Sequence, residues 1–321
     1  MSKFDEQYID LCKRILSSGE KVQNYQKTDK RSKSVSNAIP DHRAQGASET
    51  RTIRLPHQVL QFDLSEEFPI LVSKKVAFKS AVLELLWIYQ QASNDVRWLK
   101  DRKVKIWDEW EIAEDSSYQG RNINQIFKER HPDEPETDFA HTIGTAYGWI
   151  VNRYHLIDNL IETLKNNPGN RRMVLSLWQN EWLETAALPS CVWNSQWNLI
   201  DGRLNLLVTS RSSDVPLGLP FNVVQYAVLD YLIAQVIGAR PGQFTFITND
   251  AHIYENQVDG IKEQIVKYES AMKNGTLPSA PKLWLNPEVK DFYKFDCSRE
   301  LKDIKLLDYE NLGTIKMPVT E

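Results

Sequence analysis

Apolar residues recur with helical spacing in several stretches of the chain. Residues 4–19 form the first amphipathic pattern, and residues 77–93 form an apolar one interrupted by a single acid, Glu84. Residues 222–237 predict a long apolar helix that ends at Gly238, and residues 255–274 predict a helix that ends at Gly275, because glycine suits the position after a helix. One face of the first helix carries Phe4, Tyr8, Leu11, Cys12, Ile15 and Leu16.

Two stretches show the spacing of strands. Residues 171–178 alternate between apolar and polar side chains, and residues 195–209 predict a hairpin whose turn is Asp201-Gly202. Residues 20–52 are polar and irregular, which predicts a flexible surface loop. Residues 113–141 are charged and contain prolines, which predicts a surface insertion. With no internal repeat and no Gly- or Ser-rich linker, residues 1–321 are expected to form one α+β domain, a sheet with helices packed against it.

Composition narrows the class of protein. Hydrophobic residues make up 41% of the 321 residues, enough for a sizeable core, and the net charge of −4 argues against nucleic acid as the main partner. There is no apolar run of about 18 residues that would span a membrane, and the N-terminus has no secretory apolar segment, so we expect a cytoplasmic protein. Three widely spaced cysteines predict neither a disulfide framework nor a metal site.

Cys191 is the candidate nucleophile. It follows a proline-containing turn and enters a strand, where a cysteine is usually an inert part of the core. A reactive thiolate needs a cationic neighbour, and Arg211 follows the second strand of the predicted hairpin, which can bring it back beside Cys191. An arginine there can also hold a phosphate group. Cys12, in contrast, lies within the apolar stripe of the first helix and is interpreted as core.

Four further polar residues suggest a binding site. A rigid turn with two prolines leads to Asn222, which either caps the following helix or binds a ligand through its amide. His252 and Tyr254 alternate along an extended segment and therefore point to the same side. Glu84 lies within an apolar helix, where an acid is costly unless it is paired or used, which favours a functional role.

These segments together resemble the thymidylate synthase family, in its Bacillus-type form, over nearly the whole chain. The resemblance implies a mixed sheet with packed helices and a homodimer. The matching motifs are Cys191 with Gln196-Trp197, Arg211 to Asn222, Asp250 to Tyr254, Glu84 to Trp87, Ile106 to Trp110, Ala146 to Gly148, Arg171-Arg172, Leu283 to Tyr293 and Ile315 to Val319.

The resemblance implies one-carbon transfer to C5 of dUMP, which yields dTMP and dihydrofolate and consumes 5,10-methylenetetrahydrofolate. Cys191 would add to C6 of the pyrimidine, and Glu84, Tyr147, Arg211, Asp214 and Asn222 would complete the catalytic set. The implied dUMP-binding residues are Arg31 (with Arg43 as the alternative), Arg171 and Arg172 from the other subunit, Arg211, Ser212, Ser213, Asp214, Asn222, His252 and Tyr254. The implied folate-binding residues are Lys74, Trp107, Trp110, Asp214, Leu217, Gly218, Phe221 and Val319.

The chain departs from the family pattern at three positions. Ser190 stands where the family has proline, Asn249 where it has glycine, and the chain ends in Glu321 rather than in an apolar residue. A charged end would weaken the exclusion of water from the site. Two alternatives therefore stand beside the synthase: a dUMP hydroxymethylase, in which water captures the transferred carbon, and an inactive paralogue that acts by binding. Asn222 disfavours dCMP as substrate, because cytosine-specific relatives carry aspartate there.

Overall fold

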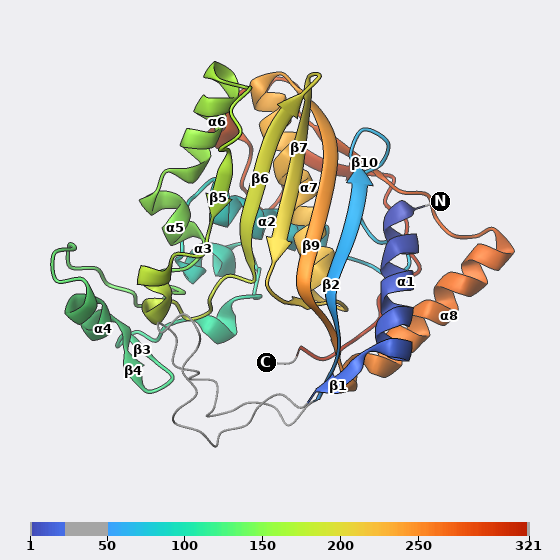
Figure 1. Ribbon diagram of the computed structural model, residues 1–321, viewed down its shortest axis with the longest axis horizontal. Coiled ribbons are helices and arrows are strands. Elements are labelled where there is room, and N and C mark those ends of the chain that lie inside the picture. Colours follow the sequence, from blue (N-terminus) through green and yellow to red (C-terminus); the bar gives the residue numbers. More distant parts are fainter. Residues whose placement is uncertain (1, 23–50, 320–321) are drawn as a thin grey trace.

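The computed structural model describes residues 2–22 and 51–319. A mixed sheet runs through its centre (Figure 1). β7 and β9 pair in parallel, as do β8 and β9, and the other pairs are antiparallel, which agrees with the expected mixed sheet. The strand order is β1 (Glu20–Val22), β2 (Thr52–Asp63), β9 (Arg240–Tyr254), β7 (Arg203–Ser210), β6 (Val192–Ile200) and β5 (Val174–Ser176), with β8 (Ser213–Asp214) beside β9.

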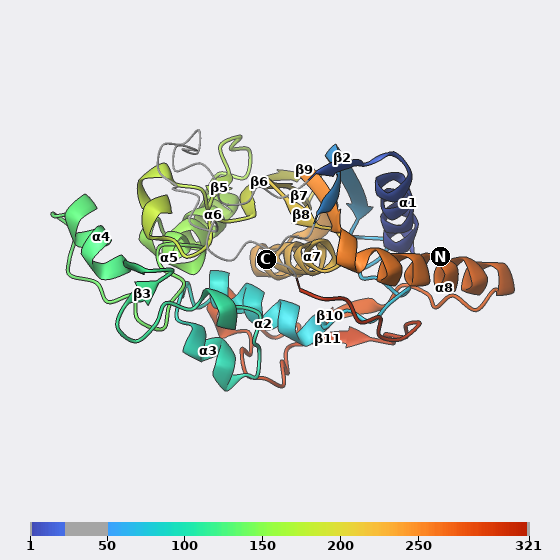
Figure 2. The same cartoon turned by 90° about the horizontal axis from the view of Figure 1, so that it is seen from below.

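Helices cover one face of this sheet. α7 (Gly218–Ile237) lies against the strands, and α2 (Phe78–Tyr89) packs on the far side of α7 (Figure 2). α7 is long and apolar enough to cross a membrane by length and composition, but most of it is buried, so it is the core helix of a globular domain. The remaining elements are α1 (Lys3–Ser18), α3 (Val96–Asp101), η2 (Asp108–Trp110), α5 (Gly148–Arg153), α6 (Leu156–Asn166), η3 (Asn180–Thr185), η4 (Glu255–Gln257), α8 (Val258–Asn274), β10 (Lys282–Leu285), η5 (Phe292–Lys294) and β11 (Ile304–Leu307).

All four predicted helices are present, but two of them begin elsewhere. α7 starts at Gly218, four residues before the predicted start, because Pro220 is tolerated within the first helical turn. Asn222 therefore lies inside the helix, and its interpretation as an N-cap is wrong. The helix predicted from residue 255 opens with the 3-10 turn η4, and α8 proper begins at Val258.

The predicted hairpin is confirmed as β6 and β7. Asp201 (φ 51°) and Gly202 (φ 68°) both adopt left-handed backbone conformations, as a two-residue hairpin turn of type I′ requires. The strand predicted over 171–178 is shorter, because only Val174–Ser176 pairs with β6.

The two stretches without periodicity contain secondary structure among their described residues. The loop prediction for 20–52 is wrong at its ends, where Glu20–Val22 forms β1 and Thr52 begins β2. Within 113–141 lie a small hairpin, β3 (Ser117–Tyr118) with β4 (Arg121–Asn122), and α4 (Ile123–Arg130). Phe127 of α4 is buried and stacks on Trp182, 6.0 Å between ring centroids. Such short elements offer too few residues for a period to show.

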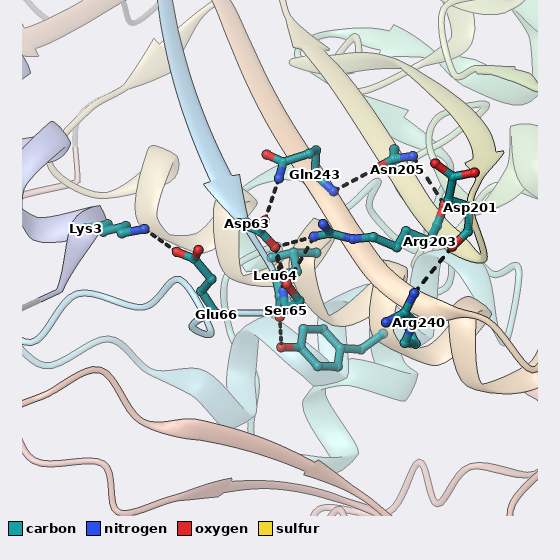
Figure 3. A network of polar contacts seen from close by, with 11 residues as sticks. Lys3, Asp63, Leu64, Ser65, Glu66, Asp201, Arg203, Asn205, Arg240 and Gln243 are labelled. Carbon is teal, nitrogen blue, oxygen red and sulfur yellow. Dashed lines mark hydrogen bonds and ion pairs between the residues drawn. The ribbon is translucent and has the colours of Figure 1, made fainter.

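A polar network joins the strands at the end of the sheet that carries the hairpin turn (Figure 3). Arg203 of β7 forms an ion pair with Asp63 of β2, and Gln243 of β9 donates to the same carboxylate (2.6 Å). The backbone N–H of Gln243 also donates to the Asn205 side chain (2.8 Å). Gly242 is required beside them, since an added Cβ would lie 2.4 Å from the Leu204 carbonyl oxygen. This network holds the register of three strands and leaves the opposite end of the sheet for the site.

Asp230, in the middle of α7, is fully buried, and neither carboxyl oxygen has a hydrogen-bond partner of normal geometry among the described residues. Burial raises the pKa of Asp230 well above its usual value, and the Gly242 backbone offsets only a part. The folded protein therefore keeps a proton at pH values where the unfolded chain has lost it. In the unfolded chain the pKa of Asp230 is about 4. As the pH rises above this value, the unfolded chain loses the proton and the folded protein does not, so the free energy of unfolding falls until the pH reaches the pKa of the folded state.

We therefore expect the melting temperature of Asp230→Asn, relative to the unaltered protein, to rise as the pH increases above about 4. About 1.4 kcal/mol per pH unit corresponds to roughly 2 °C per unit for a chain of this size. Thermal melts at four pH values measure the difference. Asp10→Asn, an exposed partner of Arg14 on α1, is the control and should show little pH trend. A pH-independent difference for Asp230→Asn would contradict the protonated state.

Candidate active site

Cys191 and Arg211 meet at the end of the sheet where β6 begins and β7 ends. The backbone N–H of Arg211 donates to the Cys191 carbonyl oxygen (2.9 Å), which continues the hairpin pairing. Its guanidinium donates to the carbonyl oxygens of Ser190 (3.1 Å) and Pro189 (2.8 Å) and lies 3.5 Å from Cys191 Sγ. The predicted approach of Arg211 to the thiol is confirmed.

Tyr147 holds the other side of the Cys191 loop. The backbone N–H of Cys191 donates to Tyr147 Oη (3.0 Å), and the Tyr147 ring packs edge-on against Trp107, 5.3 Å between centroids. Tyr147 has φ 47° and ψ −106°, a strained backbone conformation for a bulky residue. The next residue must be glycine, because a Cβ at Gly148 would lie 1.9 Å from the Ser93 carbonyl oxygen.

Glu84 reaches toward this loop from α2. Its carboxylate accepts a hydrogen bond from Trp107 Nε1 (2.7 Å) and another from Gln225 Nε2 (2.6 Å). Desolvation of the carboxyl raises the pKa of Glu84 to about 7, so the group is able to exchange a proton near neutral pH. Gln225 also accepts from Asn222 Nδ2 (3.2 Å), so one chain of contacts runs from Asn222 through Gln225 to Glu84.

Asp214 anchors the loop before α7. Its Oδ1 accepts from the Leu217 backbone N–H (3.1 Å) and its Oδ2 from Gln257 Nε2 (3.1 Å). Desolvation raises the pKa of this carboxyl as well. Lys74 is buried, and its ammonium donates to the carbonyl oxygen of Pro216 in the same loop. Burial lowers the pKa of Lys74 to about 8.

His252 and Tyr254 lie near the end of β9 and share a face, as their spacing predicted. Their rings are 5.1 Å apart in an edge-to-face arrangement. His252 Nδ1 lies 3.0 Å from Asp250 Oδ1 and 3.4 Å from Ser212 Oγ. The strand end therefore gathers ring, hydroxyl and carboxyl groups beside the Arg211 loop.

The comparisons with known proteins agree with this arrangement. The family model described as thymidylate synthase matches residues 6–321. The chain belongs to the thymidylate synthase family. It is 43% identical to the thymidylate synthase of Clostridium beijerinckii over 320 residues, covering all of both chains, and 37% identical to thymidylate synthase 1 of Bacillus subtilis, covering 97% and 96%. The solved structure of thermostable thymidylate synthase A from Bacillus subtilis superposes with a TM-score of 0.75 at 35% identity, covering 99% of each chain.

Membership in the thymidylate synthase family defines the reaction. The enzyme is a methyltransferase that converts dUMP to dTMP with a folate as co-substrate, and the hydroxymethylase alternative is not favoured. Neither is the inactive paralogue, because the relatives that span the full chain are named as synthases.

Several residues implied by the family resemblance are exposed in this single chain or lie outside its described residues. Arg171 and Arg172 are exposed just before β5, and their side chains form no ion pair with any residue between 51 and 319 or between 2 and 22. Val319 is 67% exposed, whereas Ile315 is buried and Met317 packs on the core. Arg31, Arg43 and Glu321 lie outside the described residues.

Sequence reasoning missed two glutamines of this site, Gln225 and Gln257. Gln225 lies three residues after Asn222 on α7, so helical spacing from a known site residue was a usable signal. Gln257 follows Tyr254 by three residues in a 3-10 turn, and nothing in its local sequence indicates that it reaches Asp214.

Proposed function

We propose that this member of the thymidylate synthase family forms dTMP through a covalent adduct on Cys191. The Sγ–C6 bond forms, and the electron pair of the C5=C6 bond moves toward O4, which makes C5 a nucleophile. C5 then attacks the one-carbon unit of 5,10-methylenetetrahydrofolate. The observation that carries this proposal is the Arg211 guanidinium, fixed 3.5 Å from Cys191 Sγ by two backbone carbonyls.

The later steps require a proton site and a hydride donor. The proton on C5 leaves, the folate nitrogen departs as an amine, and the Sγ–C6 bond breaks as the exocyclic methylene accepts a hydride from the folate, which becomes dihydrofolate. Glu84, with a pKa of about 7, is the group suited to relay protons. Trp107 donates to Glu84 and packs against the Tyr147 ring, so it links the two residues. Asn222, joined to Glu84 through Gln225, is positioned to hydrogen-bond O4 and N3 of the uracil.

The two substrates are assigned to neighbouring groups of residues. Arg211, Ser212 and Ser213 would bind the dUMP phosphate, and His252 and Tyr254 the sugar hydroxyl. The folate would lie between the rings of Trp107 and Trp110 and the start of α7. The C-terminal tail, the residues after β11 including Val319, would lie at its edge. Lys74 donates to Pro216, so its contribution there is to fix the loop that carries Asp214. The proposed folate-binding residues are Trp107, Trp110, Asp214, Leu217, Gly218 and Phe221.

A homodimer with shared arginines completes the phosphate site. Within residues 2–22 and 51–319, no helix covers the sheet face opposite α7 (Figures 1 and 2). One row of paired positions crosses five strands on that face, and each of its side chains is at least partly exposed: Gln61, Thr245, Leu207, Gln196 and Val174. A second copy docked on this face would receive Arg171 and Arg172, which precede β5 at its edge.

We also assign the enzyme to the cytoplasm. All three cysteines are free thiols, and the proposed mechanism depends on a reduced Cys191. A reducing compartment keeps such thiols unpaired.

The direct test of the reaction supplies purified protein with dUMP and 5,10-methylenetetrahydrofolate. We expect dTMP, identified by mass spectrometry, and dihydrofolate, followed by absorbance, to form in equal amounts. The equality follows because each methylene reduced takes one hydride from one folate. A product that is mainly 5-hydroxymethyl-dUMP, with no dihydrofolate, would contradict the synthase reaction and support the hydroxymethylase.

A further inference from the structure

Gln257 is a fully buried amide that contacts three separate parts of the site. Its Oε1 accepts from the Tyr254 backbone N–H (3.1 Å), at the end of the strand that carries the sugar-site residues. Its Nε2 donates to Asp214 Oδ2 (3.1 Å) and to the Pro318 carbonyl oxygen in the C-terminal tail (3.2 Å). One side chain thus joins a nucleotide-site strand, a folate-site carboxylate and the tail.

The chemistry of the three partners fixes the orientation of the amide. Tyr254 offers a backbone donor, whereas Asp214 and Pro318 offer only acceptors in these contacts, so the oxygen must face Tyr254 and the nitrogen the other two. Both N–H bonds of Gln257 and its carbonyl are then used. A carboxylate of the same shape would keep the Tyr254 contact but would place a negative charge against Asp214 and the Pro318 carbonyl.

The tail also packs against α8, which begins at the residue after Gln257. Gly260 leaves room for Met317, since a Cβ at this glycine would lie 2.7 Å from Met317 Cγ. Upstream, the Leu312 backbone N–H donates to the Val72 carbonyl oxygen (2.9 Å), and the Gly313 carbonyl accepts from Lys75 (2.8 Å). The tail is therefore held by backbone contacts before Met317, and Gln257 supplies the side-chain contact beyond it.

We infer that Gln257 is a positioning residue that couples the seating of the tail to the orientation of Asp214. This inference rests on the proposed role of Asp214 in folate binding. When Pro318 accepts one N–H of the amide, the other N–H is directed at Asp214, so a seated tail and a correctly placed carboxylate occur together. Losing the amide nitrogen uncouples them, which weakens folate binding and admits water to the methylene intermediate, while dUMP binding is retained.

Gln257→Glu tests this coupling, because it retains the acceptor for Tyr254 and removes both donors. We expect the KM for methylenetetrahydrofolate to rise about tenfold or more, the usual effect of losing a hydrogen bond to a charged group, and the Kd for dUMP alone to stay within about twofold. The fraction of 5-hydroxymethyl-dUMP in the product should rise.

Gln264→Glu is the matched control. Gln264 is equally buried, lies on α8 and donates to Ser73 (2.7 Å), so its amide donates to neither Asp214 nor Pro318. It should reproduce any loss of melting temperature but leave the folate KM within about twofold. Gln257→Met, uncharged and of similar length, replaces the glutamate variant if the latter does not fold and should also raise the folate KM.

The outcomes separate the inference from the function on which it rests. Failure of the unaltered enzyme to make dihydrofolate would reject the proposed reaction itself. With an active unaltered enzyme, three results overturn the role of Gln257: an unchanged folate KM in its variants, a dUMP Kd that rises in parallel, or the same KM increase in Gln264→Glu. A selective rise in the folate KM of the Gln257 variants supports it.

Discussion

Cys191→Ser is expected to lower dTMP formation by at least about a thousandfold while dUMP still binds. A serine hydroxyl at this position is a much weaker nucleophile than a cysteine sulfur, so the variant forms the bond to C6 far more slowly. The contacts that hold the loop use the backbone of residues 189–191 and so remain in the variant. Dihydrofolate absorbance measures turnover, and calorimetry with dUMP measures binding.

Cys297→Ser is the control for this substitution. Cys297 is also partly exposed, but it is distant from Cys191 in the sequence and its sulfur accepts a hydrogen bond from Gln91. It should keep turnover within about twofold. Cys12→Ala removes a fully buried thiol and should lower stability without abolishing turnover. Near-normal turnover in Cys191→Ser would exclude the covalent mechanism.

Mixing two inactive variants, Arg172→Ala and Cys191→Ala, is expected to restore about a quarter of the unaltered activity. After random exchange of subunits, half of the dimers are hybrids, and each hybrid has one site with both Cys191 and an intact Arg172 from the other chain. The exposed position of Arg172 before β5, with no ion pair to any described residue, leaves it available to a second copy. Dihydrofolate formation after a denaturation–renaturation exchange measures the recovery.

A second mixture serves as the control for this exchange. Glu84 contacts Trp107 and Gln225 within the same chain as Cys191, so Glu84→Gln and Cys191→Ala each damage the site of their own chain. Their hybrids contain no intact site and should stay inactive. Absence of recovery in the Arg172 mixture, despite hybrids seen by native mass spectrometry, would contradict the shared site.

Local patterns in the sequence were sufficient for the main helices and for the hairpin. Periodic apolar residues identify α1, which buries one stripe of its surface, and α2, which buries nearly all of its surface. Asp201-Gly202 identifies the turn because its backbone angles are set within two residues. The same hairpin argument brought Arg211 beside Cys191, since strand pairing converts a separation of twenty residues into direct contact.

Other features of the site depend on contacts that no local pattern encodes. The pKa of Glu84 reflects its desolvation between Trp107 and Gln225, which lie on other elements. An exposed glutamate has a pKa of about 4, and the pKa of Glu84 rises above this value only when those elements pack around it. The pKa of Asp230 is raised for the same reason, since its environment consists of the core around α7.

The order of residues was therefore enough to predict four of the helices, the hairpin, the approach of Arg211 to Cys191 and the family. Only the folded chain shows where α7 begins, that Lys74 is turned toward Pro216, and that Gln257 joins Asp214 to the tail. The physical reason is the separation in sequence over which each kind of interaction acts. Helical and turn preferences act over a few neighbouring residues, whereas the hydrogen bonds and burial that tune this site join residues that are dozens to more than a hundred positions apart in the chain.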